Sequence, residues 1–199
     1  MIPHKTFYFI RHGETDWNKD RIIMGHTDIP LNQNGILQAY SAQKFFKDLT
    51  FDRIYASPLK RAYQTVEILN EHLKSSLVTD DDLMERGFGK YEGGPHNPSS
   101  LLLKSSELPE GAESIEEVDE RVLRAMQKIL SESKSTPLIV SHGGVFVALA
   151  RHCAANPDLR AANCQLFLFK APDDPLGKWT ICDVRDADLD KIYQDKNIQ

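Results

Sequence analysis

The sequence has few cysteines, no long apolar run and no excess of positive charge, and each of these absences excludes a class of protein. Cys153, Cys164 and Cys182 are odd in number and form no Cys-x-x-Cys pair. Neither a zinc site nor a disulfide framework is expected, and buried free thiols are the simpler interpretation. No apolar run approaches the roughly 20 residues that span a bilayer, and the first residues lack the apolar segment of a signal peptide. We therefore expect a cytoplasmic protein with no membrane partner.

The charge and the length of the chain narrow its partners and its organisation. The net charge is −5 and both signs are interspersed, which argues against a nucleic-acid partner bound through bulk charge. The 199 residues, 41% of them apolar, are enough for one domain with a sizeable core. We expect a single domain over residues 1–199, without repeats or an interdomain linker. The sequence leaves the oligomeric state open.

Strand-like and helix-like segments alternate along the chain. Short apolar runs predict strands at 6–10, 51–57, 77–79, 137–141, 165–169 and 178–184. Apolar residues at helical spacing predict helices over 36–46 after a break at 31–35, from the N-cap Ser57-Pro58 to about His72, from the capping box Ser114-Ile-Glu-Glu117, and over 145–153. This alternation favours an α/β fold, a three-layer α/β/α sandwich with a mainly parallel central sheet. Residues around 93–112, rich in Pro, Ser and Gly, are expected to form a loop or small lid.

Two of the predicted strands end in the same way, in a histidine followed by glycine. The first runs into Arg11-His12-Gly13, and the strand at 137–141 runs into His142-Gly143-Gly144. Ligands of open α/β sheets lie outside the carboxyl ends of the strands, so we expect His12 and His142 side by side at one such edge. A neutral imidazole is a competent nucleophile, and a second one can stabilise charge on the group that is transferred.

Other residues of the sequence suit an anion pocket around these histidines. Arg11 and Arg61 carry planar guanidinium groups that match phosphate or carboxylate oxygens. Thr15 and turn amides such as that of Gly25 can complete a pocket that favours a phosphoryl group. Phosphoryl transfer also needs a proton donor for the leaving oxygen, and Glu85 is the best candidate because it precedes a glycine turn. Four nearby carboxylates compete for this role: Asp80, Asp81, Asp82 and Glu92.

A set of motifs follows one order along roughly residues 5–150. The motifs are Arg11-His-Gly-Glu-Thr15, Asn18, Gly25 with Asp28-Ile-Pro-Leu31, Ser57-Pro-Leu-Lys-Arg-Ala-Tyr-Gln-Thr65, Glu85 with Phe88-Gly89, and Ser141-His-Gly-Gly144. In this order they resemble the histidine phosphatase superfamily, phosphoglycerate mutase branch. Several ordered motifs are a much stronger signal than one Arg-His-Gly triplet.

The resemblance implies a mechanism and a set of site residues. It implies a phosphohistidine on His12, with Arg11, Arg61 and His142 around the phosphoryl group and Glu85 acting first as acid and then as base. The substrate would be a small-molecule phosphate ester. No metal and no other cofactor is required in that scheme, because arginines and histidines supply the positive charge. The phosphate-binding ligands would be Thr15, Asn18, Gly25 and Gly143.

Hydrolases and mutases of this family differ after the acid. The mutases carry a longer insertion with several basic residues, whereas 93–112 offers only Lys104 besides His96. Gly144 and Phe88 stand where the mutases typically have asparagine and tyrosine, and both departures resemble phosphatases. Met24 stands where a polar residue is usual in either group.

We therefore expect a metal-independent phosphomonoester hydrolase of a small phosphorylated metabolite. A cofactor-dependent phosphoglycerate mutase is the alternative enzyme. A phosphate-ligand binding module on the same scaffold is the alternative without catalysis. The other five histidines are expected to be surface or satisfied core residues, and His26 and His96 are the two of them that could approach the substrate. The sequence leaves the identity of the substrate open.

Overall fold

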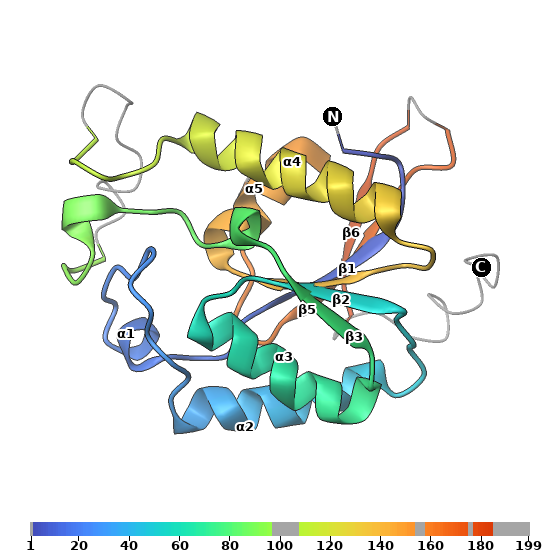
Figure 1. The fold of residues 1–199 in the computed structure, drawn as a ribbon, viewed down its shortest axis with the longest axis horizontal. Helices are drawn as coiled ribbons and strands as arrows, with labels where there is room; N and C mark the ends of the chain where they lie inside the picture. Colours follow the sequence, from blue (N-terminus) through green and yellow to red (C-terminus); the bar gives the residue numbers. More distant parts are fainter. Residues whose placement is uncertain (1, 97–107, 154–157, 175–176, 185–199) are drawn as a thin grey trace.

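A six-stranded sheet forms the centre of the computed structural model, which describes residues 2–96, 108–153, 158–174 and 177–184 (Figure 1). The strands are β1 (Phe7–Arg11), β2 (Arg53–Ala56), β3 (Ser76–Thr79), β4 (Leu138–Ser141), β5 (Leu166–Lys170) and β6 (Thr180–Asp183). Across the sheet they follow the order β3-β2-β4-β1-β5-β6. Strands β1 to β4 pair in parallel, whereas β5 is antiparallel to both β1 and β6. The predicted α/β fold with a mainly parallel sheet is confirmed.

Helices cover both faces of this sheet, as Figure 1 shows. On one face lie α2 (Gln33–Ala42) and α3 (Lys60–Leu73), and on the other lie α4 (Ile115–Glu132) and α5 (Gly143–Cys153). Each helix pair encloses its own apolar cluster against the sheet, which gives the three predicted layers. In the described part of the chain, the connections contain the short helix α1 (Asp16–Lys19) and the 3₁₀ turns η1 (Gln43–Phe46), η2 (Asp81–Leu83) and η3 (Gly89–Tyr91).

The sequence of α4 explains both where this helix begins and which face it buries. The Ser114 hydroxyl accepts from the Glu117 backbone N–H at 3.1 Å, and the Glu117 carboxylate accepts from the Ser114 N–H at 2.7 Å. These two bonds form the predicted capping box, which satisfies backbone donors that the first turn of a helix leaves open. The apolar stripe of Val118, Val122 and Ile129 is buried against the sheet.

Two predicted helix starts are wrong. The expected cap Ser57-Pro58 does not begin α3, which starts at Lys60 after Leu59 and has no side-chain cap. The Ser57 hydroxyl accepts from the Leu59 N–H at 3.3 Å, ahead of the helix, and lies 2.7 Å from His142 Nε2. The expected break at 31–35 is also wrong, because Asn32 caps α2 through the Gly35 N–H, and the helix begins at Gln33.

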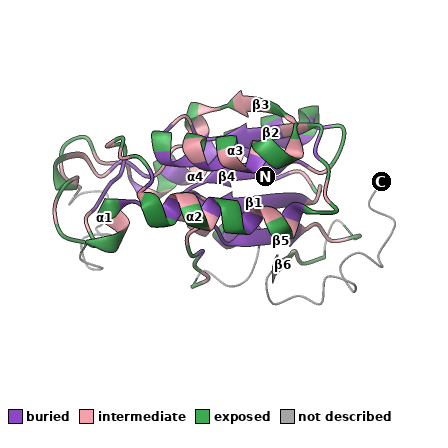
Figure 2. Cartoon of the chain, turned by 90° about the horizontal axis from the view of Figure 1, so that it is seen from below, coloured by how far each residue is buried: buried purple, intermediate pink, exposed green. Residues whose placement is uncertain are grey.

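Burial follows the layers of the fold. Figure 2 shows a largely buried sheet, with the exposed positions of α2 and α3 on their outward faces.

Cys153 and Cys164 are buried, and burial raises the pKa of each thiol to about 12. Cys182 is only half-buried, so the expectation of buried thiols fails for it. Most of the expected lid, 97–107 with Lys104, lies outside the described residues. Within the described part of the chain, no helix combines the length and apolarity needed to cross a membrane.

Candidate active site

The register of two parallel strands brings the two histidines together. Arg11 of β1 pairs with Ser141 of β4, and the His12 N–H donates to the Ser141 carbonyl at 2.9 Å. The next residue on each strand is therefore a histidine at the same edge of the sheet. The rings of His12 and His142 have centroids 5.1 Å apart and planes inclined by 57°, and both residues are fully buried.

His12 has the protonation pattern of a nucleophile. Its Nδ1 lies 2.7 Å from the Gly13 carbonyl oxygen, which can only accept, so Nδ1 carries the hydrogen and Nε2 carries the lone pair. Burial, reinforced by the charges of Arg11 and Arg61, holds the pKa of His12 well below its usual range. The ring is thus neutral at neutral pH, and its Nε2 has no hydrogen-bond partner among the described residues.

His142 is anchored through one ring nitrogen and has the other available. Its Nε2 lies 2.7 Å from the Ser57 hydroxyl, while its buried Nδ1 has no partner within the described segments. Burial, followed by the charges of Arg61, His12 and Arg11, lowers the pKa of His142 well below its usual range. Because Ser57 follows β2, which lies beside β4, a third strand end supports this ring.

Two arginines supply the positive charge of the site. Arg61, fully buried in the first turn of α3, donates to the carbonyls of Thr27 at 3.0 Å and Gly25 at 2.8 Å. Arg11 donates to the Ala161 carbonyl at 2.8 Å. Burial is the main cause that lowers the pKa of each guanidinium from its ordinary value, but an arginine keeps its charge in proteins.

Four buried nitrogens of these side chains have no partner among the described residues. They are Arg11 Nε, His12 Nε2, Arg61 Nε and His142 Nδ1. Buried polar atoms are normally hydrogen-bonded, so a cluster of unsatisfied ones needs an explanation. The two guanidinium nitrogens are donors, and acceptor oxygens of an anion would satisfy them. The group of atoms therefore combines a lone pair that can attack with donors that can hold a phosphoryl group.

Glu85 is the carboxylate that contacts the turn of His142, Gly143 and Gly144. Its Oε1 accepts from the Gly144 and Arg86 backbone N–H groups, each at 2.9 Å. A Cβ atom on Gly144 would collide with Oε1, so glycine permits this close approach. The competing carboxylates lie elsewhere: Asp80 and Asp82 form ion pairs with Lys128 and Arg124 of α4, and Glu92 accepts four hydrogen bonds from neighbouring loops.

The expected phosphate ligands differ in what they contact. The fully buried Thr15 hydroxyl accepts from the Asn18 N–H at 3.1 Å and lies 3.2 Å from the Met24 sulfur, so Met24 takes part in this hydrogen bonding. Gly25, with φ of +52°, contributes its carbonyl to Arg61. Gly143 follows His142 directly, and a Cβ atom there would lie 3.7 Å from the Arg11 guanidinium.

The two further histidines lie in different surroundings. His26 donates from Nε2 to the Glu85 carbonyl at 2.7 Å, so it contacts the segment that carries the expected acid. His96 is exposed, and its backbone N–H donates to the Arg21 carbonyl at 2.7 Å. The structure thus links His26, but not His96, to Glu85 directly.

Sequence reasoning missed the residues that support the site. Thr65 accepts from the Gly13 N–H at 3.0 Å and donates to the Arg61 carbonyl at 2.6 Å. Asn163 donates to the His12 carbonyl at 2.9 Å. Thr65 ends a motif that the sequence made visible, whereas nothing around Asn163 signals a role. The carboxylates and the arginine that hold the surrounding loops, Glu92, Glu113 and Arg121, were also missed or misassigned.

The described residues give no metal centre from protein ligands: within them, no three His, Cys, Asp or Glu side chains are grouped to hold a metal ion. The positive charge next to His12 comes from Arg11 and Arg61, and the charge of each arginine contributes to the lowered pKa of His12.

Comparison with known proteins agrees with this arrangement. The family model of the histidine phosphatase superfamily (branch 1) matches residues 7–169. The chain therefore belongs to this superfamily and is a phosphatase of it. It is 38% identical over 154 residues to an uncharacterized phosphatase, PhoE, of Bacillus subtilis, covering 76% of this chain and 79% of that one. It is 33% identical over 198 residues to phosphoglycerate mutase-like protein 4 of Arabidopsis thaliana, covering 90% and 84%.

Solved structures share the fold. A mycobacterial glucosyl-3-phosphoglycerate phosphatase in complex with VO3 superposes with a TM-score of 0.75 at 22% identity, covering 89% of this chain and 97% of that one. At this identity the likeness concerns the fold alone.

Proposed function

We propose that the protein is a cytoplasmic, metal-independent phosphomonoester hydrolase that acts on a small phosphorylated metabolite through a phosphohistidine on His12. The observation that carries the proposal is the neutral His12 ring, whose Nδ1–H is held by the Gly13 carbonyl and whose Nε2 is free of partners among the described residues. A buried imidazole with this tautomer presents a lone pair to an electrophile without first losing a proton.

The geometry supports a reaction in two steps. In the first, His12 Nε2 forms a bond to phosphorus as the bond from phosphorus to the ester oxygen breaks, and the Glu85 carboxyl gives its proton to the departing oxygen. In the second, the Glu85 carboxylate takes a proton from water as the water oxygen attacks phosphorus. The N–P bond breaks, inorganic phosphate leaves, and the electron pair returns to Nε2. Arg11 and Arg61 hold the phosphoryl oxygens throughout.

The relatives support hydrolysis of small phosphate esters. Besides the Bacillus phosphatase, the chain is 32% identical to a putative phosphoserine phosphatase 2 of Hydrogenobacter thermophilus. VO3, an oxyanion like the phosphoryl group, is bound in the mycobacterial phosphatase of the same fold. A pocket built from Arg11, Arg61, His12 and His142 suits such an anion, and this pocket together with the phosphatase relatives at 38% and 32% identity is the reason to expect phosphate esters here.

A substrate panel tests the proposal. Purified protein is incubated with phosphorylated sugars, glycerates, phosphoserine, nucleotides and p-nitrophenyl phosphate, and phosphate release is read as kcat/KM. We expect turnover of at least one metabolite, and a His12→Ala variant that keeps its circular dichroism spectrum but loses turnover. A correctly folded wild-type protein that releases no phosphate from any compound would contradict the proposal.

The same panel separates the two alternatives from hydrolysis. Conversion of 3-phosphoglycerate to 2-phosphoglycerate, stimulated by bisphosphoglycerate and faster than phosphate release, would identify a mutase instead. Binding of panel compounds by calorimetry without turnover would identify a phosphate-ligand binding module.

A further inference from the structure

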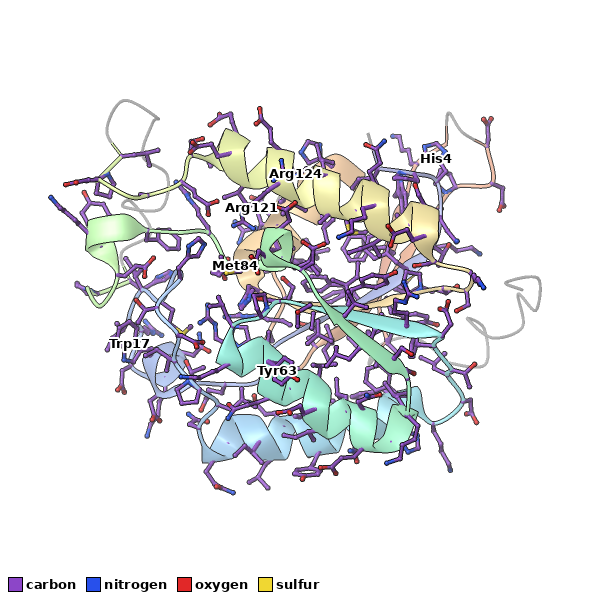
Figure 3. All side chains as sticks on the ribbon, viewed as in Figure 1. His4, Trp17, Tyr63, Met84, Arg121 and Arg124 are labelled. Carbon is purple, nitrogen blue, oxygen red and sulfur yellow. The ribbon has the colours of Figure 1, made fainter. Side chains whose placement is uncertain are left out.

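Arg121 of α4 is almost completely enclosed and uses its whole guanidinium group. The residue is 9% exposed. Its Nη1 donates to the carbonyls of Asp82 at 2.9 Å and Met84 at 2.7 Å, and its Nη2 donates to the carbonyl of Glu85 at 2.9 Å. Three carbonyls on the segment that leads into Glu85 thus accept from one side chain. Figure 3 shows Arg121 beside Met84, between α4 and the turn below it.

Glu113 holds Arg121 and the far side of the same segment. Its carboxylate accepts from Arg121 Nε at 2.7 Å and Nη2 at 2.9 Å, and from the Gly87 N–H at 2.6 Å. Burial acts to raise the pKa of Glu113, but the hydrogen bonds from Arg121 and Gly87 outweigh it and keep that pKa below its ordinary value. The ionised pair therefore joins α4 to the backbone on both sides of Glu85.

The Glu85 carboxylate itself touches neither partner of this pair. Among the described residues, its Oε1 accepts from two backbone N–H groups, those of Gly144 and Arg86. These bonds require the Glu85 backbone to stand at a fixed distance from the turn of His142, Gly143 and Gly144. His26 adds a second donor to the Glu85 carbonyl. The position of the acid thus depends on what holds its backbone.

We propose that Arg121, oriented by Glu113, is the positioning residue of the Glu85 acid. The inference rests on the proposed function, in which Glu85 protonates the leaving oxygen. Arg121 acts through the backbone: its hydrogen bonds go to the segment around Glu85 and to Glu113, and toward the histidines it contributes only its charge, the last-named cause of the lowered pKa of His142. Arg121→Lys keeps this charge. The loss of the Arg121 guanidinium therefore affects proton donation and leaves the phosphoryl pocket of Arg11 and Arg61 intact.

This division predicts a dependence on the leaving group. An alkoxide leaving group needs a proton as the ester bond breaks, whereas p-nitrophenolate is stable enough to depart without one. The parameter kcat/KM covers the steps up to departure of the leaving group, so later hydrolysis of the phosphohistidine does not enter it. A displaced acid lowers kcat/KM for alkyl esters much more than for p-nitrophenyl phosphate.

The experiment uses Arg121→Lys and Glu113→Gln, with Arg124→Gln as the matched control. Lysine keeps the charge but cannot reproduce the planar set of guanidinium N–H groups that donates to three carbonyls and a carboxylate. Arg124 lies one turn further on the same helix, 65% exposed in its side chain, and contacts the Asp82 carboxylate instead of the backbone around Glu85. Figure 3 labels both arginines on α4.

For Arg121→Lys we expect kcat/KM to fall ~30-fold on the best alkyl ester of the panel and less than ~3-fold on p-nitrophenyl phosphate. Glu113→Gln is expected to fall between Arg121→Lys and wild type, and Arg124→Gln to match wild type. The acidic limb of the kcat/KM profile, which reports the essential groups of the free enzyme, is expected to change only in the first two variants.

The outcomes separate this inference from the proposed function. If wild-type protein hydrolyses neither ester, the proposed function is wrong and the inference falls with it. If wild-type protein hydrolyses both and Arg121→Lys and Glu113→Gln lower both by the same factor, or neither, Arg121 does not position the acid. If Arg121→Lys fails to fold, the ratio of the two esters in Glu113→Gln decides the question.

Discussion

The two halves of the candidate active site are held by different means. His12 and His142 stand at strand ends, where the backbone pairing of β1 with β4 fixes their separation. Glu85 and the carbonyls that receive Arg61 lie in loops, where the half-buried carboxylates of Glu92 and Glu113 hold the backbone. Strand pairing is shared by many residues, so one substitution at the sheet edge removes a function without moving its neighbours. In the loops, one substitution moves a whole segment.

Glu92 is the clearest example of the loop mechanism. Its Oε1 accepts from the backbone N–H groups of His26 at 2.9 Å and Phe88 at 3.0 Å. Its Oε2 accepts from the N–H of Thr27 at 2.8 Å and from the hydroxyl of Thr27 at 2.6 Å. The same loop offers the Gly25 and Thr27 carbonyls to Arg61. Glu92 thus has its acceptor capacity in use. In the proposed mechanism it supports the loop that receives Arg61 and does not compete with Glu85.

The largest effect is expected at the sheet edge. A His142→Asn change removes the Nδ1 group beside His12 while the strand pairing remains, so we expect kcat to fall ~10³-fold with the fold retained. The control is His152→Asn near the end of α5, the helix that follows His142, where the histidine pairs with Asp119. Steady-state rates and thermal melting measure the two properties. A kcat of His142→Asn within about threefold of wild type would contradict the view that a single substitution at the sheet edge removes a function.

A smaller and more uniform loss is expected from Glu92→Gln. Removing one charged oxygen loosens the loop that receives Arg61, and displacing a group that holds the substrate weakens catalysis. We expect kcat/KM to fall ~10-fold, by the same factor for alkyl and p-nitrophenyl esters, because Arg61 serves the phosphoryl group common to both.

The control for this change is Glu110→Gln, whose side chain is 79% exposed and pairs with Lys90. It is expected to leave both rates unchanged. A larger loss of kcat/KM for alkyl esters than for p-nitrophenyl phosphate in Glu92→Gln would show that Glu92 positions Glu85. Glu92 and Arg121 would then support the same part of the site.

The smallest effect is expected in the pH dependence of the free energy of unfolding. Both His12 and His142 have a pKa lowered by burial, so below pH ~6.5 the unfolded chain binds protons that the folded chain does not. Stability is therefore full above that pH and falls as the pH drops through it, by up to about 1.4 kcal/mol per pH unit for each histidine. Urea unfolding between pH 7.5 and 5 measures the slope.

The slope is expected to decrease in a His12→Asn variant and to stay unchanged in His72→Gln, where the residue is exposed. A wild-type stability that does not change over this range would show that the sheet-edge histidines are not held neutral.

The same division explains how far the sequence alone predicted this protein. The sheet edge was predictable because apolar runs ending in His-Gly define strands and their ends, and parallel strands place their ends together. The residues that support the loops could not be predicted in this way. Arg121 and Glu85 are 36 residues apart in the chain, and Arg121 binds the backbone carbonyl of Glu85. A bond to a backbone carbonyl leaves no pattern in the residue types. Ser57 misled for a related reason, because a serine before proline resembles a helix cap while its hydroxyl binds a histidine 85 residues away.

Trapping the phosphorylated enzyme shows whether His12 carries the phosphoryl group. Wild-type protein and His12→Ala are mixed with a ³²P-labelled substrate under single-turnover conditions, quenched over a series of times and digested for mass spectrometry. We expect label that is acid-labile and base-stable, located on His12 of the wild type and absent from the variant. Turnover by the wild type with no histidine-bound label at any time, or label in an acid-stable linkage, would contradict a phosphohistidine on His12.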